Sequence, residues 1–205
     1  MKHRTPTSRN AIALVLSLCL MTLSLTTSKV FAQEQFAIRT VAYKKLTELP
    51  PGTLYWRLEN FPTLAQAREA EGPTSMAAEV AGKVWLFTLG PKGSSSGGTR
   101  VAEVGPVPRI AATEYMIRIT NSGGPPGAKT PVHSHPGAEA FYVLAGRMGQ
   151  KTPNGVTYTE AGQSMNGHGA DMPMEVFSAG TTNLDQLVMF LVDAAKPFAV
   201  PAKLE

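Results

Sequence analysis

The sequence predicts a mostly β protein with antiparallel strands, arranged as a barrel or a sandwich. Short segments rich in β-branched and aromatic residues follow one another from residue 99 to residue 192. Glycine, proline and asparagine residues separate these segments at short intervals, and the chain has no internal repeat. Short strands with frequent turns are typical of antiparallel barrels and sandwiches.

Residues 1–32 have the pattern of a secretory signal peptide. Basic residues precede an apolar run from Ala11 to Leu25, and Val30-Phe31-Ala32 then places small or apolar residues where a signal peptidase reads them. The run is too short, and wrongly flanked, for a membrane span. We therefore expect cleavage after Ala32, a secreted or periplasmic protein, and no stable membrane insertion afterwards.

Cleavage would also change the charge and the cysteine content. The signal carries four basic residues and no acidic one, so residues 33–205 hold equal numbers of basic and acidic side chains. The basic isoelectric point therefore gives no support for nucleic-acid binding. The only cysteine, Cys19, also leaves, and because it follows Leu18 rather than a small residue we reject a lipoprotein anchor. The mature chain must then be stabilised by its core, alone or with a metal.

A short helix is expected in the first third of the mature chain. Thr63 and Gln66 have the spacing of a capping box, residues 64–71 are rich in helix formers, and Gly72-Pro73 provides a stop. This part of the chain is interpreted as a cover for the rest of the protein rather than as a site.

Residues 76–80 and 84–88 are expected to pair as a hairpin, because both segments are rich in β-favouring residues. Residues 90–98 follow, with three successive serines, and are too polar and flexible to pack. They are either a hairpin tip or a linker. The only plausible boundary lies there, and it divides an N-terminal extension of residues 33–98, which packs on the barrel, from a barrel of residues 99–205.

The barrel is expected to contain five clear strands. Residues 115–120 alternate between apolar and mostly polar side chains, which suits a strand with one buried face and one wet face. Asn154-Gly155 forms a tight turn, and residues 121–131 form a loop rich in glycine and proline. The expected strands are residues 115–120, 138–145, 147–152, 156–159 and 187–192.

Two of these strands are apolar on both faces. Residues 138–145 have no wet face, and residues 187–192 contain no polar side chain. Such strands need cover on both sides. The cover is either the N-terminal segment or a second subunit, so a homodimer is expected unless the N-terminal segment covers the face completely.

One short stretch carries the side chains of a metal site. Gly127 is followed by His133, His135, Glu139 and Gly146. In extended chain His133 and His135 point to the same side, and Glu139 shares their parity. Neutral imidazoles and a carboxylate suit one divalent transition metal, Mn, Fe, Ni, Zn or Cu, without choosing among them. The alternative is a pair of exposed loop histidines beside a solvated glutamate.

These five residues, at this spacing, resemble the first motif of the cupin superfamily. The resemblance implies an all-β, cupin-like antiparallel barrel, or jelly roll, with His133, His135 and Glu139 as metal ligands. The family's second motif is altered, because Gly162 fits its start but Pro173 or Met174 occupies the place of a third histidine ligand. His168 is the alternative fourth ligand. It is equally well explained as an exposed loop histidine.

Three methionines, Met165, Met172 and Met174, surround His168 and raise the alternative of copper handling through thioether and imidazole ligands. Methionine is also an ordinary filler of irregular cores, and packing is favoured. The candidates for contact with a small-molecule substrate near the barrel mouth are Lys129, Phe141 and Arg147.

The resemblance leaves two function classes open, because cupin proteins include both enzymes and binding proteins. The first is a metal-dependent oxygenase or isomerase that acts on a small molecule. The second is a non-catalytic metal-binding or small-ligand-binding protein of the cell envelope, which the altered second motif favours. The first class is slightly preferred.

Overall fold

The computed structural model describes residues 35–204, so the expected signal peptide lies outside the described residues. Within this range the protein is mostly β, with antiparallel sheets and one short helix, as the sequence predicts. None of the described helices is long and apolar enough to cross a membrane.

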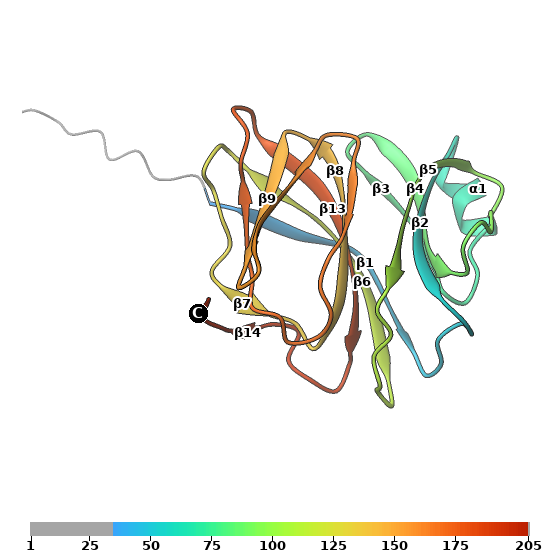
Figure 1. The fold of residues 1–205 in the computed structure, drawn as a ribbon. Helices are drawn as coiled ribbons and strands as arrows, with labels where there is room; N and C mark the ends of the chain where they lie inside the picture. Colours follow the sequence, from blue (N-terminus) through green and yellow to red (C-terminus); the bar gives the residue numbers. More distant parts are fainter. Residues whose placement is uncertain (1–34, 205) are drawn as a thin grey trace, which may run out of the picture. The chain divides into compact units, whose positions relative to one another are not determined.

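A central sheet of five strands forms the middle layer (Figure 1). One of its faces packs against a four-stranded cover sheet, and the other faces a three-stranded small sheet. The central sheet has the order β1 (Ala37–Leu46), β6 (Tyr115–Gly124), β13 (Leu184–Asp193), β8 (Gly137–Ala145) and β11 (Ser164–Asn166). The cover sheet has the order β3 (Ser75–Val80), β4 (Lys83–Gly90), β2 (Leu54–Phe61) and β5 (Thr99–Val107). The small sheet has the order β10 (Gly155–Glu160), β9 (Arg147–Thr152) and β12 (Glu175–Ser178), and β7 (His133–Ser134) pairs separately with β14 (Val200–Pro201).

Strand β13 shows why the chain contains strands without a wet face. Leu187, Met189 and Leu191 belong to the core between the central sheet and the cover sheet. Val188 and Phe190, which alternate with them, belong to the core on the opposite face. Because successive side chains of a strand point to opposite faces, a strand between two layers must be apolar at every position.

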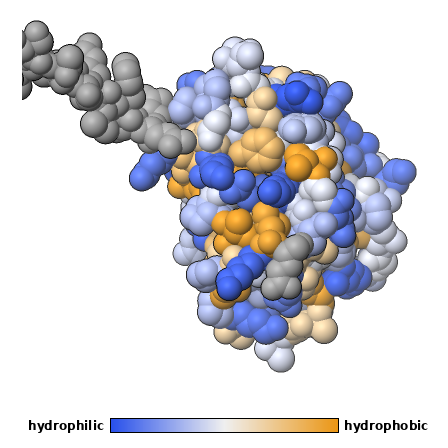
Figure 2. Space-filling view, turned by 60° about the vertical axis from the view of Figure 1, so that its left-hand side comes forward, coloured by the Kyte–Doolittle hydropathy of each residue, from blue (hydrophilic) through white to orange (hydrophobic). Residues whose placement is uncertain are grey.

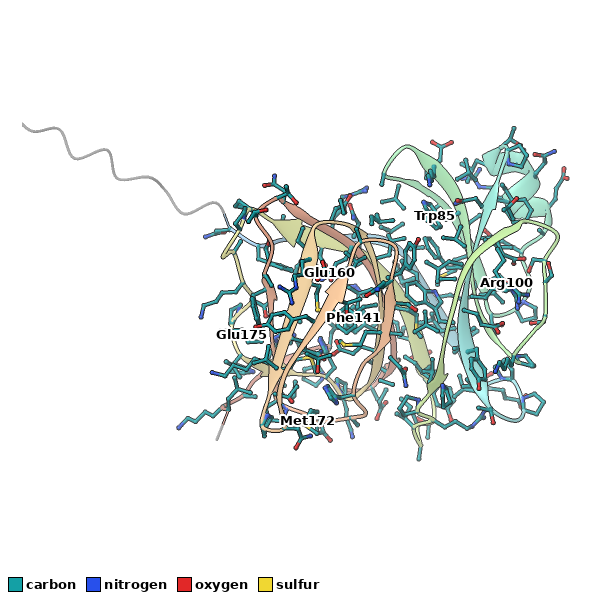
Figure 3. All side chains as sticks on the ribbon, turned by 45° about the horizontal axis from the view of Figure 1, so that its top comes forward. Trp85, Arg100, Phe141, Glu160, Met172 and Glu175 are labelled. Carbon is teal, nitrogen blue, oxygen red and sulfur yellow. The ribbon has the colours of Figure 1, made fainter. Side chains whose placement is uncertain are left out.

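The cover sheet is held by large aromatic side chains. Trp85, labelled in Figure 3, stacks on Phe87 at 6.0 Å between ring centroids. It also meets Tyr142 of β8 edge-on at 6.3 Å, so this contact bridges the two sheets. Each fully buried side chain of this size contributes roughly 1.5–3 kcal/mol. The expectation that the doubly apolar strands need cover is confirmed, and β2 to β5 supply it. A homodimer stays a prediction.

Two local predictions in the cover are confirmed. Helix α1 (Leu64–Glu69) begins after Thr63, whose hydroxyl accepts a hydrogen bond from the Gln66 backbone N–H at 3.3 Å. Strands β3 and β4 form the expected hairpin, and Ala81 and Gly82 at its tip both have positive φ, 51° and 69°. This backbone conformation is the one that tight hairpin turns require.

The strands are distributed differently from the expected division at residue 98. Strand β1, from the expected extension, pairs with β6 of the central sheet. Strand β5, which begins at residue 99, pairs with β2 of the cover sheet. Strand β6 also continues to Gly124, so the loop expected from residue 121 begins later.

The serine-rich loop differs from the expectation that it is too polar to pack. Ser95 Oγ donates to Glu59 Oε1 at 2.9 Å, and the Ser96 backbone N–H donates to the same carboxylate. Ser94 and Ser96 hydroxyls also contact the Arg57 guanidinium. The loop therefore closes over a buried Arg57–Glu59 ion pair. Neither residue lies near the loop in sequence, which is why the sequence pattern could not show the contact.

Candidate functional site

A cavity of about 510 Å³ lies on the small-sheet side of the central sheet. The inner face of the central sheet, β12 and the segments 130–135 and 198–201 enclose it, and most of the lining side chains are apolar. The side of the molecule that carries β7 and β14 is brought forward in Figure 2, where hydrophobic residues gather between hydrophilic ones. Two of the cavity-lining residues, Ile38 and Val200, are exposed large hydrophobic side chains.

His133 is held at this cavity by its own backbone. Its N–H donates to the Met174 carbonyl at 3.0 Å, and its carbonyl accepts from the Met174 N–H at 2.8 Å. On the other side β7 pairs with β14. The ring Nδ1 lies 2.8 Å from the Pro131 carbonyl oxygen. A carbonyl can only accept, so this Nδ1 carries the hydrogen, and in the neutral imidazole Nε2 keeps its lone pair.

His135 repeats this arrangement in a more buried place. Its Nδ1 lies 2.7 Å from the Phe198 carbonyl oxygen, so its Nε2 is also left as an acceptor. The ring packs between Phe190 and Phe198, with centroids at 4.7 and 4.8 Å. Burial is the main cause that lowers the pKa of His135 to about 4; the nearby His133 and Arg118 act in the same direction, and the Phe198 hydrogen bond opposes them. His135 is therefore neutral at neutral pH, as a metal ligand must be.

The two imidazoles lie against each other, with ring centroids 4.9 Å apart and planes at 83°. Metal-binding histidines commonly donate the second ring N–H to a carbonyl or carboxylate, which sets the tautomer and the ring orientation. In His133 and in His135 the Nδ1 atom makes such a hydrogen bond to a backbone carbonyl.

Glu139 faces the same cavity from β8, and it is 2% exposed. Gln150 Nε2 donates to its Oε1 at 2.6 Å. Burial raises the pKa of Glu139 to about 8, although the Gln150 hydrogen bond opposes this. Gly167 permits the burial, because a Cβ there would lie 2.6 Å from Glu139 Cγ. The structure thus brings His133, His135 and Glu139 to one cavity.

His168 is placed differently. Its backbone carbonyl accepts from the Glu139 N–H at 3.4 Å, but its side chain is not among those that line the cavity. Within residues 35–204 no three histidine, aspartate, glutamate or cysteine side chains lie close enough together to hold a metal ion. The donors present therefore fit a metal in type and in the tautomer of both histidines, while these residues do not form a closed three-ligand group.

The methionines near His168 serve mainly as packing. Met174 is 1% exposed and accepts a weak hydrogen bond at its sulfur from Gln150, at 3.4 Å. Met165 packs against the core on the cavity side of the central sheet, opposite Phe141. Met172 lies at one end of the barrel (Figure 3). These positions favour the packing interpretation over a thioether metal site.

Of the three candidates for substrate contact, only Phe141 lines the cavity. Lys129 pairs with Glu175 at 2.9 Å and is 57% exposed. Arg147 pairs with Glu160 at 2.8 Å, and its guanidinium lies over the Tyr158 ring. Because both cations already have partners outside the cavity, the structure does not bring them to the site.

Arg118 is the cavity cation that the sequence interpretation missed. It lies on β6, opposite Phe190 of β13. On its other side Phe190 lies opposite Glu139 of β8. The alternation in residues 115–120 predicted that the strand face carrying Arg118 and Thr120 is wet, and this face lines the cavity. That alternation was the available signal, since a polar face inside a covered barrel has to line a cavity.

No family model and no curated protein matches the chain. Several solved structures are similar to part of it. A cupin-like protein from Thermotoga maritima matches with 17% identity and a TM-score of 0.38, over 43% of this chain and 65% of that one. A DMSP lyase from Ruegeria pomeroyi matches with 20% identity and a TM-score of 0.38, over 43% of this chain and 44% of that one.

A salicylate 1,2-dioxygenase from Pseudoaminobacter salicylatoxidans matches with 18% identity and a TM-score of 0.33, over 36% of this chain and 20% of that one. In each of these three cases the match spans less than two thirds of the other protein. Cupin-fold proteins are thus structural neighbours of this chain at distant identity, and these partial matches assign it no activity.

Proposed function

We propose that this protein is a metal-dependent enzyme that acts on a small molecule in the cavity, of the oxygenase or isomerase type. One divalent transition metal would be held by His133 and His135, with Glu139 as the third ligand. The observation that carries the proposal is that both histidines present a free Nε2 while Glu139 faces the same, mostly apolar cavity.

The chain's own residues would contribute in three ways. Pro131 and Phe198 carbonyls hold the imidazoles in the tautomer that leaves Nε2 free. Phe190 and Phe198 exclude water around His135, which strengthens electrostatic interactions in the site. Glu139, when no metal is bound, is kept protonated by burial and can hold or release a proton at its carboxyl. A bound metal would supply a Lewis acid next to the substrate.

We also propose that the protein works outside the cytoplasm, as the signal-like pattern of residues 1–32 indicates. Mass spectrometry of the periplasmic or secreted fraction should find a mature chain that begins at Gln33. An intact Met1, or a lipid on Cys19, would contradict this proposal.

Metal content is the first test of the site. The exported protein is purified without added metal and analysed for Mn, Fe, Ni, Cu and Zn. His133→Ala, His135→Ala and Glu139→Ala should each lose most of the bound metal, because a site with two remaining ligands loses charge and geometry. Lys129→Ala, at a paired surface cation, is the control and should keep full occupancy. Full occupancy in His133→Ala and Glu139→Ala would overturn the proposed site.

His168→Ala tests the fourth ligand separately. Because His168 is not among the residues that line the cavity, this variant should keep its metal. A clear loss of affinity would show that the loop brings His168 inward when metal binds.

The second candidate is a non-catalytic metal-binding or small-ligand-binding protein. It is favoured by the lack of a closed three-ligand group among the described residues and by the lack of a cavity acid or base other than Glu139 and the histidines. Oxygen consumption and substrate turnover by metal-loaded protein separate the two classes. Tight binding with no turnover over a broad panel of small molecules would favour the second.

A further inference from the structure

Arg118 is a cation on the wall of a mostly apolar cavity, and no carboxylate among residues 35–204 pairs with it. The described ion pairs use other cations, among them Arg57, Lys129 and Arg147. The single side-chain hydrogen bond of Arg118 within this range goes to the neutral hydroxyl of Thr40. Its Nε is buried and has no hydrogen-bond partner there. A buried unpartnered donor on a charged group costs free energy unless something else pairs with it.

The nearest carboxyl group on the cavity wall does not neutralise Arg118. Glu139 lies on β8, with β13 between it and β6, and its Oε1 is bonded to Gln150. The other titratable groups that line the cavity are the two histidines. The excess positive charge on this wall is therefore left for a ligand.

The guanidinium is also fixed in place. Its Cζ lies 4.2 Å from the centroid of the Phe198 ring, and Phe198 packs on Phe190 at 4.9 Å. A planar guanidinium held against an aromatic ring presents its remaining N–H groups in a fork that matches a carboxylate. Phe141, Val188 and Phe190 continue the same wall as an apolar surface.

We propose that the cavity binds a small organic acid, with its carboxylate on Arg118 and its apolar body against Phe141, Phe190 and Phe198. This inference deepens the proposed function, because it names the ligand class of the same cavity. The cavity volume of about 510 Å³ lies in the ordinary range for small-molecule sites.

Isothermal titration calorimetry on chelator-treated, metal-free protein tests the inference. The probes are phenylacetate and octanoate, each compared with its uncharged amide. The acids should bind at least about tenfold more tightly than the amides, since a charge-assisted bidentate pair is made only by the carboxylate. Equal affinity for acid and amide, or binding of neither acid, would overturn the inference without any variant being made.

Variants then test whether Arg118 is the cation that binds the carboxylate. Arg118→Met should abolish the preference for the acids while leaving the weak amide binding, and Arg118→Lys should keep part of the preference. The matched control is Arg147→Met, because Arg147 also lies 4.2 Å over an aromatic ring but outside the cavity. A preference that survives in Arg118→Met, or is lost in Arg147→Met, would contradict the assignment.

Metal content is measured on the same preparations, so that the two proposals fail separately. Arg118-dependent acid binding by a protein that takes up no metal would leave this inference standing and overturn the metal site. Metal uptake without any preference for acids would overturn this inference and leave the metal site standing.

Discussion

The protein has an arginine and a glutamate near each other in two places, and the two places differ in how the charges are satisfied. On the outer face of the cover sheet, Arg57 and Glu59 are 4% and 0% exposed and lie 2.9 Å apart. On the cavity face of the central sheet, Arg118 and Glu139 lie on one row with Phe190 between them. The first two residues neutralise each other. The second two do not.

The pKa values of the two carboxyl groups reflect this difference. Burial tends to raise the pKa of Glu59, but hydrogen bonds from Arg57, Ser96 and Ser95 outweigh it and hold this pKa below its ordinary value. For Glu139 burial is opposed only by Gln150, and the pKa rises to about 8. A buried pair whose charges neutralise each other is a structural device, whereas a buried carboxyl group with a strongly raised pKa beside a cavity is typical of a functional site.

The largest effect is expected from breaking the satisfied pair. Glu59→Ala should lower the free energy of unfolding by about 3–5 kcal/mol, because Arg57 is left buried without its partner. Urea denaturation monitored by circular dichroism measures this. Replacing both residues by Met and Leu should cost much less than Glu59→Ala alone. A Glu59→Ala protein of wild-type stability would remove the contrast between the two settings.

The next effect concerns Glu139 in metal-free protein. Its pKa rises from an ordinary 4.5 to about 8 on folding, so the folded state holds the proton more tightly and stability falls as pH rises through this window. The group contributes up to about 1.4 kcal/mol per pH unit. Glu139→Gln should therefore abolish most of the fall between pH 6.5 and pH 8. An unchanged profile in this variant would mean that Glu139 is not held protonated.

His135 should show the opposite sign and a smaller effect. Its pKa falls from 6.5 to about 4, so the unfolded chain binds the proton more tightly and stability is lost as pH falls through this window. His135→Phe should reduce the loss below pH 6.5 in metal-free protein. Between pH 4.5 and pH 6.5 the two groups oppose each other, so each is best measured as the difference between wild type and its own variant.

The smallest effect is expected at the exposed ion pairs. Lys129→Ala and Arg147→Met should each change the free energy of unfolding by less than about 1 kcal/mol, since exposed pairs are screened by solvent. Thermal melts at low and high salt check this. A larger loss of stability would contradict the expectation that solvent screens these ion pairs. A loss of ligand binding would mean that these cations take part in the site.

Local sequence patterns predicted seven of the fourteen described strands, the capped helix and the β3–β4 hairpin. Alternation, caps and turn residues act over a few neighbours, and so they can be recognised in the sequence alone. The same holds for the cluster of His133, His135 and Glu139, because these residues lie close together in the chain. The sequence patterns missed the packed serine loop, the long strands β1, β2 and β5 and the short strands β7, β11, β12 and β14. The stabilising contacts of β1, β2 and the serine loop come from residues distant in the sequence.

The sequence by itself determined that strand β13 must be buried on both faces and that two histidines and a glutamate lie together. Only the tertiary structure decided that the cover sheet, rather than a second copy, supplies the burial in this chain. It also decided that Arg118, not Arg147, faces the cavity. The physical reason is that a charge is defined as free or paired by its partners in space, and Glu160 pairs with Arg147 while no described carboxylate pairs with Arg118.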